Sequence, residues 1–283
     1  MQYALIGSNR HEPFPRGRGI CPMCGSGMIA KCGPHVLHHW AHEGRKNCDP
    51  WWENETEWHR TWKNLFPEEC REVSLVASDG EIHRADIRTP TGIYIEVQHS
   101  AMTDVERDSR EGFYRNLIWI IDGRAFLKNF DVLHELPDPN SEAALDIVWF
   151  KAKRPSYGAA QGIYYRLSET RKIYPDRHFT KANIKANIDI MVKIHSIREI
   201  KADVDQAYRG HHQYDWIRPR RTWLDATCPV YIDFGNDHLA RLEIYDESNL
   251  PCIRYITKKK FLHDVMVETD ASRIATRFYP LPG

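Results

Sequence analysis

The feature that most constrains the fold of this chain is a pair of short segments, each with an acidic residue, on either side of a turn. The segments Arg84-Ala85-Asp86 and Ile95-Glu96-Val97-Gln98 lie on either side of the turn signal Thr89-Pro90-Thr91-Gly92. Two apolar runs separated by such a turn are typical of a β-hairpin. We therefore expect Asp86 and Glu96 to converge from neighbouring strands. Two convergent carboxylates suit a hard divalent cation such as Mg²⁺ or Mn²⁺, which prefers oxygen ligands.

A helix is predicted directly before the hairpin, over residues 51–66. Apolar side chains recur there at helical spacing, and Pro67 ends the run. On this helix Glu55, His59 and Lys63 follow one another at intervals of four, which places them on one face. Such a row is often just a solvated charge ladder. Its position before the acidic hairpin favours a role in the same site.

The segments around the hairpin predict an α/β domain. The pattern of polar and apolar residues predicts three strands over residues 72–78, 82–88 and 92–98. A helix over residues 102–115 and a fully buried strand over residues 117–121 follow. Together with the first helix, this order favours a mixed central sheet with helices around it.

A separate metal site is predicted in the first fifty residues. Cys21 and Cys24 have the two-residue separation of half a zinc site. We expect His42 and Cys48 to complete a Cys₃His set, with His39 as the alternative histidine. A reduced Cys-x-x-Cys loop with surface histidines is the plainer interpretation. The density of ligands in a segment with little hydrophobic pattern favours structural Zn²⁺.

Composition narrows the possible partners and the compartment. Lysine plus arginine and aspartate plus glutamate both number 39, so bulk charge gives no attraction to nucleic acid and any contact must be local. The candidate contacts are arginines near the hairpin or in a basic stretch further on: Arg84, Arg107, Arg110, Arg220 and Arg221. No signal peptide and no membrane span are expected, and clustered cysteines favour a reducing, cytoplasmic setting.

Changes in composition predict four parts. The first two are a zinc-binding module over residues 1–50 and a catalytic core over residues 51–125, which extends to about residue 152 at most. A helical or linker region over residues 153–222 and a small β-rich C-terminal domain over residues 223–283 follow.

Several short motifs, taken in their order and spacing, resemble the competence protein CoiA-like family. The resemblance covers residues 20–122 and is faint in the tail, at Trp223 and at Tyr231-Ile232-Asp233. The motifs are Cys21-x-x-Cys24, His39-Trp40-Ala41-His42, Glu55-x-x-x-His59-x-x-x-Lys63, Arg84-Ala85-Asp86, Ile95-Glu96-Val97-Gln98-x-Ser100, Arg110-x-x-x-Tyr114 and Trp119-Ile120-Ile121-Asp122.

This resemblance implies a restriction-endonuclease-like, PD-(D/E)xK nuclease core. It implies that Asp86 and Glu96 bind the catalytic Mg²⁺ or Mn²⁺ and that Glu55 and His59 add further active-site groups. Gln98 stands where many such nucleases have a lysine. A neutral amide can orient a water molecule but supplies no positive charge.

The resulting expectation is hydrolysis of DNA phosphodiester bonds by a metal-activated water, with Lys63 as a hypothetical source of the missing charge. The role would lie in DNA processing, in competence and recombination, or in defence. The alternative is a nucleic-acid-binding or recombination-accessory module with a degenerate nuclease fold, which acts with DNA or a protein partner. The sequence does not distinguish single-stranded from double-stranded DNA.

Overall fold

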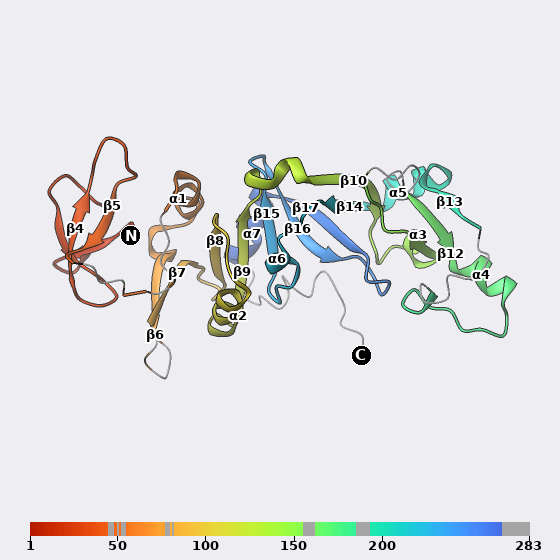
Figure 1. The fold of residues 1–283 in the computed structure, drawn as a ribbon, viewed down its shortest axis with the longest axis horizontal. Helices are drawn as coiled ribbons and strands as arrows, with labels where there is room; N and C mark the ends of the chain where they lie inside the picture. Colours follow the sequence, from red (N-terminus) through yellow and green to blue (C-terminus); the bar gives the residue numbers. More distant parts are fainter. Residues whose placement is uncertain are drawn as a thin grey trace. The chain divides into compact units, whose positions relative to one another are not determined.

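Figure 1 shows the computed structural model of the chain. The chain divides into two compact units. The structure describes residues 1–44, 48–49, 51, 55–76, 80, 82–154, 162–184 and 193–267. The first unit comprises Met1–Ile121, Ala226–Pro229 and Phe261–Gly283, and the second comprises Asp122–Asp225 and Val230–Lys260. These units group the four predicted parts differently, because the first joins the N-terminal module to the predicted core.

The N-terminal part of the first unit is a small antiparallel sheet of short strands. Its strand order is β2-β1-β3-β4-β5. The strands are β1 (Ala4–Ile6), β2 (Asn9–His11), β3 (Arg18–Ile20), β4 (Gly27–Lys31) and β5 (His39–His42). Trp40 is 1% exposed and packs with Met1, Ala4, Cys21 and Met28. This is a very small core, as expected of a module that depends on a bound ligand.

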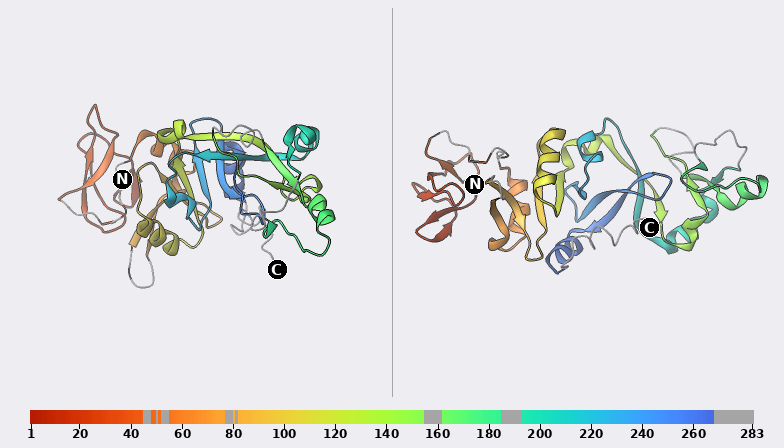
Figure 2. Two further views of the ribbon diagram at one scale, coloured as in Figure 1. Left: turned by 45° about the vertical axis from the view of Figure 1, so that its right-hand side comes forward. Right: turned by 90° about the horizontal axis from the view of Figure 1, so that it is seen from below.

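The remainder of the first unit contains the predicted order of helices and strands. The elements are α1 (Glu57–Asn64), η1 (Glu68–Cys70), β6 (Arg71–Val76), β7 (Ile82–Arg88), β8 (Tyr94–Gln98), α2 (Asp104–Phe113) and β9 (Leu117–Asp122). Strands β6, β7 and β8 are antiparallel, whereas β8 and β9 are parallel, so the sheet is mixed. The predicted α/β class is confirmed at this level. Figure 2 shows these elements and the N-terminal strands from two further directions.

Both helices of this part begin at threonine caps. The side chain of Thr56 accepts a hydrogen bond from the His59 amide, and that of Thr103 accepts one from Glu106. Helix α1 therefore begins at Glu57. The apolar spacing predicted a start near residue 51, and that boundary is wrong.

The second unit contains a larger antiparallel sheet. Its strand order is β10-β14-β17-β16-β15, and a separate small sheet has the order β11-β12-β13. Its elements are η2 (Arg124–Asn129), β10 (Phe130–Pro137), α3 (Glu142–Leu145), β11 (Ile147–Trp149), β12 (Ile163–Arg166), α4 (Leu167–Ile173), β13 (His195–Ser196), η5 (Ile197–Ile200), α5 (Lys201–Ala207), β14 (Tyr208–Trp216), α6 (Arg221–Leu224), β15 (Val230–Asp233), β16 (His238–Ile244) and β17 (Pro251–Thr257). Helix α7 (Lys258–Val267) follows β17.

Part of the region expected to be helical or a linker is instead a strand inside the larger sheet. Strand β14 pairs with β10 on one side and with β17 on the other. Its sequence is rich in histidine and other polar residues, but His211, Gln213 and Trp216 are buried. Polar side chains paired inside the unit thus concealed a strand pattern. The tail, which was predicted to be rich in β-strands, contains β15, β16 and β17.

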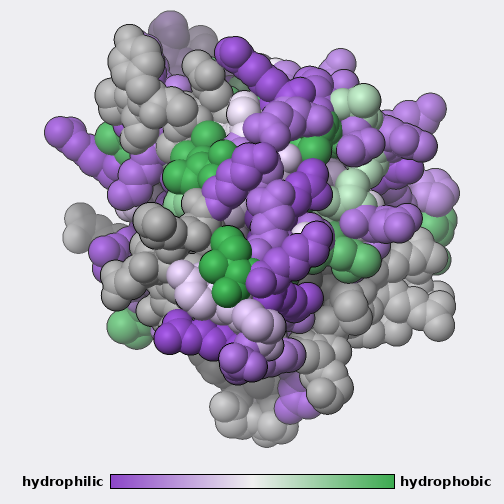
Figure 3. Space-filling model, turned by 90° about the vertical axis from the view of Figure 1, so that its right-hand side faces the viewer, coloured by the Kyte–Doolittle hydropathy of each residue, from purple (hydrophilic) through white to green (hydrophobic). Residues whose placement is uncertain are grey.

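None of the helices in the part of the chain that the structure describes has the length and apolar character needed to span a bilayer. In the view of Figure 3, hydrophobic side chains form separate small patches among hydrophilic ones.

Candidate functional site

The site begins where strands β7 and β8 separate. Their pairing ends at Ile87 and Ile95, and the next residues toward the open end are Asp86 and Glu96. The amide of Asp86 donates to Glu96 Oε1 at 3.3 Å, and the amide of Val97 donates to Asp86 Oδ2 at 3.0 Å. Each carboxylate thus accepts a hydrogen bond from a backbone amide of the neighbouring strand. The local fold brings the two acids together.

Helix α1 places a histidine against Asp86. His59 Nε2 lies 2.9 Å from Asp86 Oδ1. Burial alone would raise the pKa of Asp86, but the charge and hydrogen bond of His59, with the charge of Lys63, lower it to about 2. Asp86 is therefore ionised throughout the physiological range.

Glu96 is in the opposite electrostatic situation. Its Oε2 lies 2.9 Å from Nη1 of Arg110 on α2. Burial and the negative charge of Asp86 nevertheless raise the pKa of Glu96 to about 8, outweighing the opposing effect of Arg110. Burial is the larger of the two causes, and the neighbouring negative charge of Asp86 adds to it. A cation bound between the two carboxylates would favour the ionised form of Glu96.

A buried lysine joins two further carboxylates beside this pair. Lys63 contacts Glu55 Oε1, and its Nζ lies 2.8 Å from Glu72 Oε1. Glu55 lies outside α1, yet the expected grouping with Lys63 is present. Glu72 also accepts hydrogen bonds from the amides of Gln2 and Tyr3, and it adopts a φ of 48°. A non-glycine residue rarely has this conformation, and its three partners hold it there.

All six residues predicted to be catalytic line one cavity. It contains Glu55, His59, Lys63, Asp86, Glu96 and Gln98, together with Met1, Asp49, Trp51, Glu72, Arg84, Val97 and Arg110. Gln98 Nε2 donates to Ser100 Oγ at 2.9 Å, so the amide is held at the rim of the strand.

The sequence analysis missed two acidic residues of this cavity, Asp49 and Glu72. Asp49 is 4% exposed and Glu72 is 7% exposed. The signal for Asp49 was its position directly after the predicted zinc ligand Cys48. No pattern distinguished Glu72 from an ordinary strand residue, because its role depends on the distant N-terminal segment.

The arginines predicted to contact nucleic acid differ in their environments. Arg84 and Arg110 line the cavity. Arg107 is buried and paired with Asp104 and Asp108. Arg110 holds Glu96, and its burial at 3% exposure makes it a support of the site more than a surface contact.

The other two predicted contacts lie in the second unit. The Arg220 guanidinium lies over the Phe126 ring at 5.1 Å, and Arg221 is exposed at the start of α6. A direct contact of any of the five arginines with nucleic acid stays a prediction.

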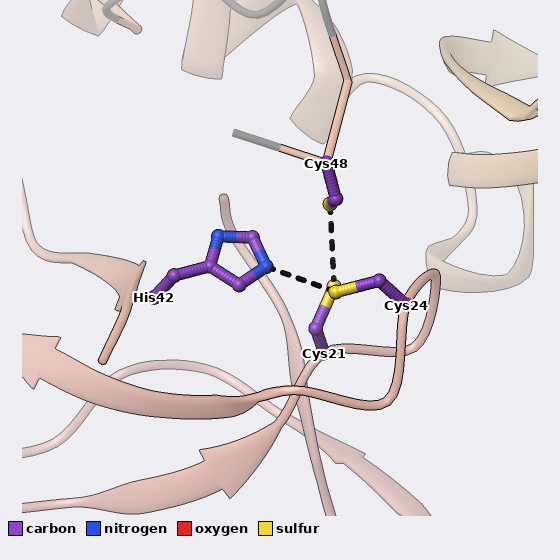
Figure 4. A group of neighbouring side chains, drawn as sticks. All are labelled: Cys21, Cys24, His42 and Cys48. Atoms are coloured by element: carbon purple, nitrogen blue, oxygen red, sulfur yellow. Dashed lines mark hydrogen bonds between the residues drawn. The ribbon is translucent and has the colours of Figure 1, made fainter. Parts of the chain in front are cut away.

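The predicted cysteine and histidine ligands do converge. The ligand atoms of Cys21, Cys24, His42 and Cys48 all lie within 4.8 Å of one another, and Figure 4 shows their side chains turned toward a common centre. Cys21 Sγ and Cys48 Sγ are 3.8 Å apart, and Cys24 Sγ and His42 Nε2 are 3.3 Å apart.

The two separations of 3.8 and 3.3 Å fit the spacing of ligands around a tetrahedral metal ion. Zinc bonds of ~2.0–2.3 Å require ligand atoms about 3.3–3.8 Å apart. The cluster could therefore hold a metal ion such as Zn²⁺ with four protein ligands. The alternative ligand His39 has its Nδ1 2.8 Å from the Leu37 carbonyl oxygen and is outside the cluster.

Comparisons with protein-family models, with curated proteins and with solved structures gave no match to this chain.

Proposed function

We propose that the chain is a metal-dependent nuclease that hydrolyses phosphodiester bonds of DNA at the Asp86–Glu96 cavity. One observation carries the proposal. The two carboxylates meet where β7 and β8 separate, in a cavity that also contains Glu55, His59 and Lys63. The order of α1, β6, β7, β8, α2 and β9 supports a restriction-endonuclease-like core, in agreement with the resemblance to CoiA-like proteins.

The residues of the cavity suit Mg²⁺ or Mn²⁺. Asp86 is ionised, and Glu96 holds a proton that a divalent cation would displace. Both offer carboxylate oxygens, the ligands that hard cations prefer. Arg110 fixes Glu96 from behind, as outer contacts commonly orient metal ligands.

The remaining residues have distinct roles in the proposed reaction. The bound cation would supply an activated water and offset charge on the phosphate. Gln98 would orient the water through its amide. His59, which already contacts Asp86, would accept or pass on a proton during the reaction. Lys63 forms ion pairs with Glu55 and Glu72, and its positive charge also lowers the pKa of Asp86. It would therefore act on the site through these carboxylates.

The Cys21–Cys24–His42–Cys48 cluster has a structural role in this proposal. All its ligands are protein side chains, which is typical of structural zinc. It would stabilise a module whose own core is small.

A cleavage assay tests the proposal. The purified chain and its Asp86→Asn variant are incubated with single-stranded and duplex DNA, with Mg²⁺, Mn²⁺ or EDTA. We expect metal-dependent cleavage that falls ~100-fold or more in the variant, since the metal contributes several kcal/mol to transition-state stabilisation. The control is Asp108→Asn, an exposed carboxylate of α2 that does not line the cavity.

Two results would contradict the nuclease. Cleavage that persists in Asp86→Asn would place the activity elsewhere. Absent cleavage with DNA binding retained in all three proteins would favour the alternative, a nucleic-acid-binding or recombination-accessory module.

A further inference from the structure

One edge of β7 carries a row of amides that end on carboxylates. The Arg84 amide donates to Asp49 Oδ2 at 3.2 Å, and two residues on, the Asp86 amide donates to Glu96 Oε1 at 3.3 Å. Alternate residues of a strand direct their amides to the same edge. Asp49 therefore extends the capping of β7 that Glu96 begins, although it comes from a different part of the chain.

Asp49 is held by more than this one contact. Its Oδ1 accepts hydrogen bonds from the Trp51 amide at 3.0 Å and lies 3.2 Å from His83 Nδ1. The side chain is 5% exposed. A buried carboxylate with three donors is fixed in position, and its loss leaves those donors unsatisfied.

The same short segment also supports Glu96. The ring of Trp51 stacks on that of His83, and the Trp51 carbonyl accepts a hydrogen bond from Arg110 Nη2 at 3.0 Å. Arg110 in turn holds Glu96 Oε2. Asp49 thus contacts the edge of β7 directly, and Trp51 is linked to Glu96 through Arg110.

The residue before Asp49 belongs to the cysteine–histidine cluster. Cys48 Sγ lies 3.8 Å from Cys21 Sγ, and the other ligands come from residues 21–42. A metal ion in the cluster would fix Cys48 and so restrict the backbone of Asp49. Without the metal ion, ordering the backbone of Asp49 so that its carboxylate caps β7 costs conformational entropy.

We infer that Asp49 is a positioning residue that couples metal binding at the cluster to the geometry of the Asp86–Glu96 pair. Loading of the cluster would order the acid pair, and loss of its metal would loosen the pair. The inference rests on the proposed function in treating this pair as the reacting site. Its test does not depend on cleavage.

The experiment uses the full chain in four states: wild type and Asp49→Asn, each with Zn²⁺ bound and after Zn²⁺ removal. Zinc content is measured per chain. NMR hydrogen exchange reports the Asp86 and Val97 amides, and the Ile120 amide in β9 reports the general fold. Electron paramagnetic resonance measures the Mn²⁺ Kd. Asp108→Asn is the matched control.

With zinc bound, Asp49→Asn should keep its zinc but exchange the two site amides ~10-fold faster, and it should bind Mn²⁺ ~10–100-fold more weakly, as outer-sphere changes do. Removing zinc from the wild type should have the same effects. In Asp49→Asn, zinc removal should add little, because the link is already broken. A uniform structural weakening would instead change Ile120 exchange and would be additive.

Unchanged exchange in zinc-bound Asp49→Asn, additive effects or loss of zinc from this variant would overturn the inference. Should that variant not fold, Asp49→Ser replaces it, and zinc removal that leaves both wild-type amides protected would also overturn the coupling. If the exchange results follow expectation but the wild type binds no Mn²⁺ at the cavity, the positioning role holds and the proposed nuclease fails.

Discussion

Replacing Lys63 by methionine should strongly destabilise the first unit. The Lys63 side chain is 2% exposed, and its ammonium contacts both Glu55 and Glu72, which are 10% and 4% exposed. Methionine fills a similar volume but carries no charge. The variant would therefore keep two buried carboxylates without their shared cation.

We expect a loss of ~3–5 kcal/mol in the free energy of unfolding, the range seen when one partner of a buried ion pair is removed. Burial lowers the pKa of Lys63, but the charges of Glu72 and Glu55 outweigh this and raise it above 10.5. Burial would raise the pKa of Glu72, but Lys63 and Arg84 lower it well below 4.5. The contribution of Lys63 to the free energy of unfolding is lost only as pH rises above 10.5. The contribution of Glu72 is lost only as pH falls below 4.5. The difference between the proteins should be full from about pH 5 to pH 10.

Urea denaturation of the full chain at pH 7 measures this loss. The double variant Lys63→Met with Glu72→Gln removes one of the two charges that lost Lys63 as their partner, so it should recover part of the stability lost in Lys63→Met. A loss below ~1 kcal/mol in the single variant, the level of an exposed ion pair, would refute the reasoning.

Two further predictions concern the acid pair and the metal cluster. The pKa of Glu96 is raised to about 8 by burial and by Asp86, so its stabilising contribution is complete below 4.5 and is lost as pH rises through about 8. Urea denaturation should therefore show Glu96→Gln gaining stability relative to the wild type between pH 5 and pH 9, by ~1 kcal/mol or more; no pH-dependent gain would contradict the raised pKa. Elemental analysis should find about one zinc per chain in wild type and in His39→Ala and almost none in Cys48→Ser. Equal zinc contents in the two variants would contradict the assigned ligands.

Much of the first unit follows from local signals. The turn before Gly92 and the alternation around Asp86 and Glu96 define the hairpin, and the ligand spacing from Cys21 to Cys48 defines the cluster. The hairpin residues are close in sequence, so alternation and the turn signal suffice to predict their pairing. For the cluster, spacing indicated Cys21 and Cys24 as a pair but left the histidine ligand open between His42 and His39.

What the sequence did not reveal depends on distant contacts. Glu72 acquires its role from the amides of Gln2 and Tyr3, and Asp49 from the edge of β7. Strand β14 was concealed because its polar residues are satisfied inside the second unit, where Gln213 accepts a hydrogen bond from the Ala152 amide. Such pairings leave no periodic pattern in the chain.

The central claim is that Asp86 and Glu96 together bind a divalent cation. Crystals of the zinc-loaded protein soaked in Mn²⁺ would test it by anomalous diffraction at the manganese edge. We predict a peak between the two carboxylates, within ~2.0–2.4 Å of an oxygen of each, and its loss in Asp86→Asn. A cavity without such a peak, in crystals where the wild type retains its zinc, would contradict the account.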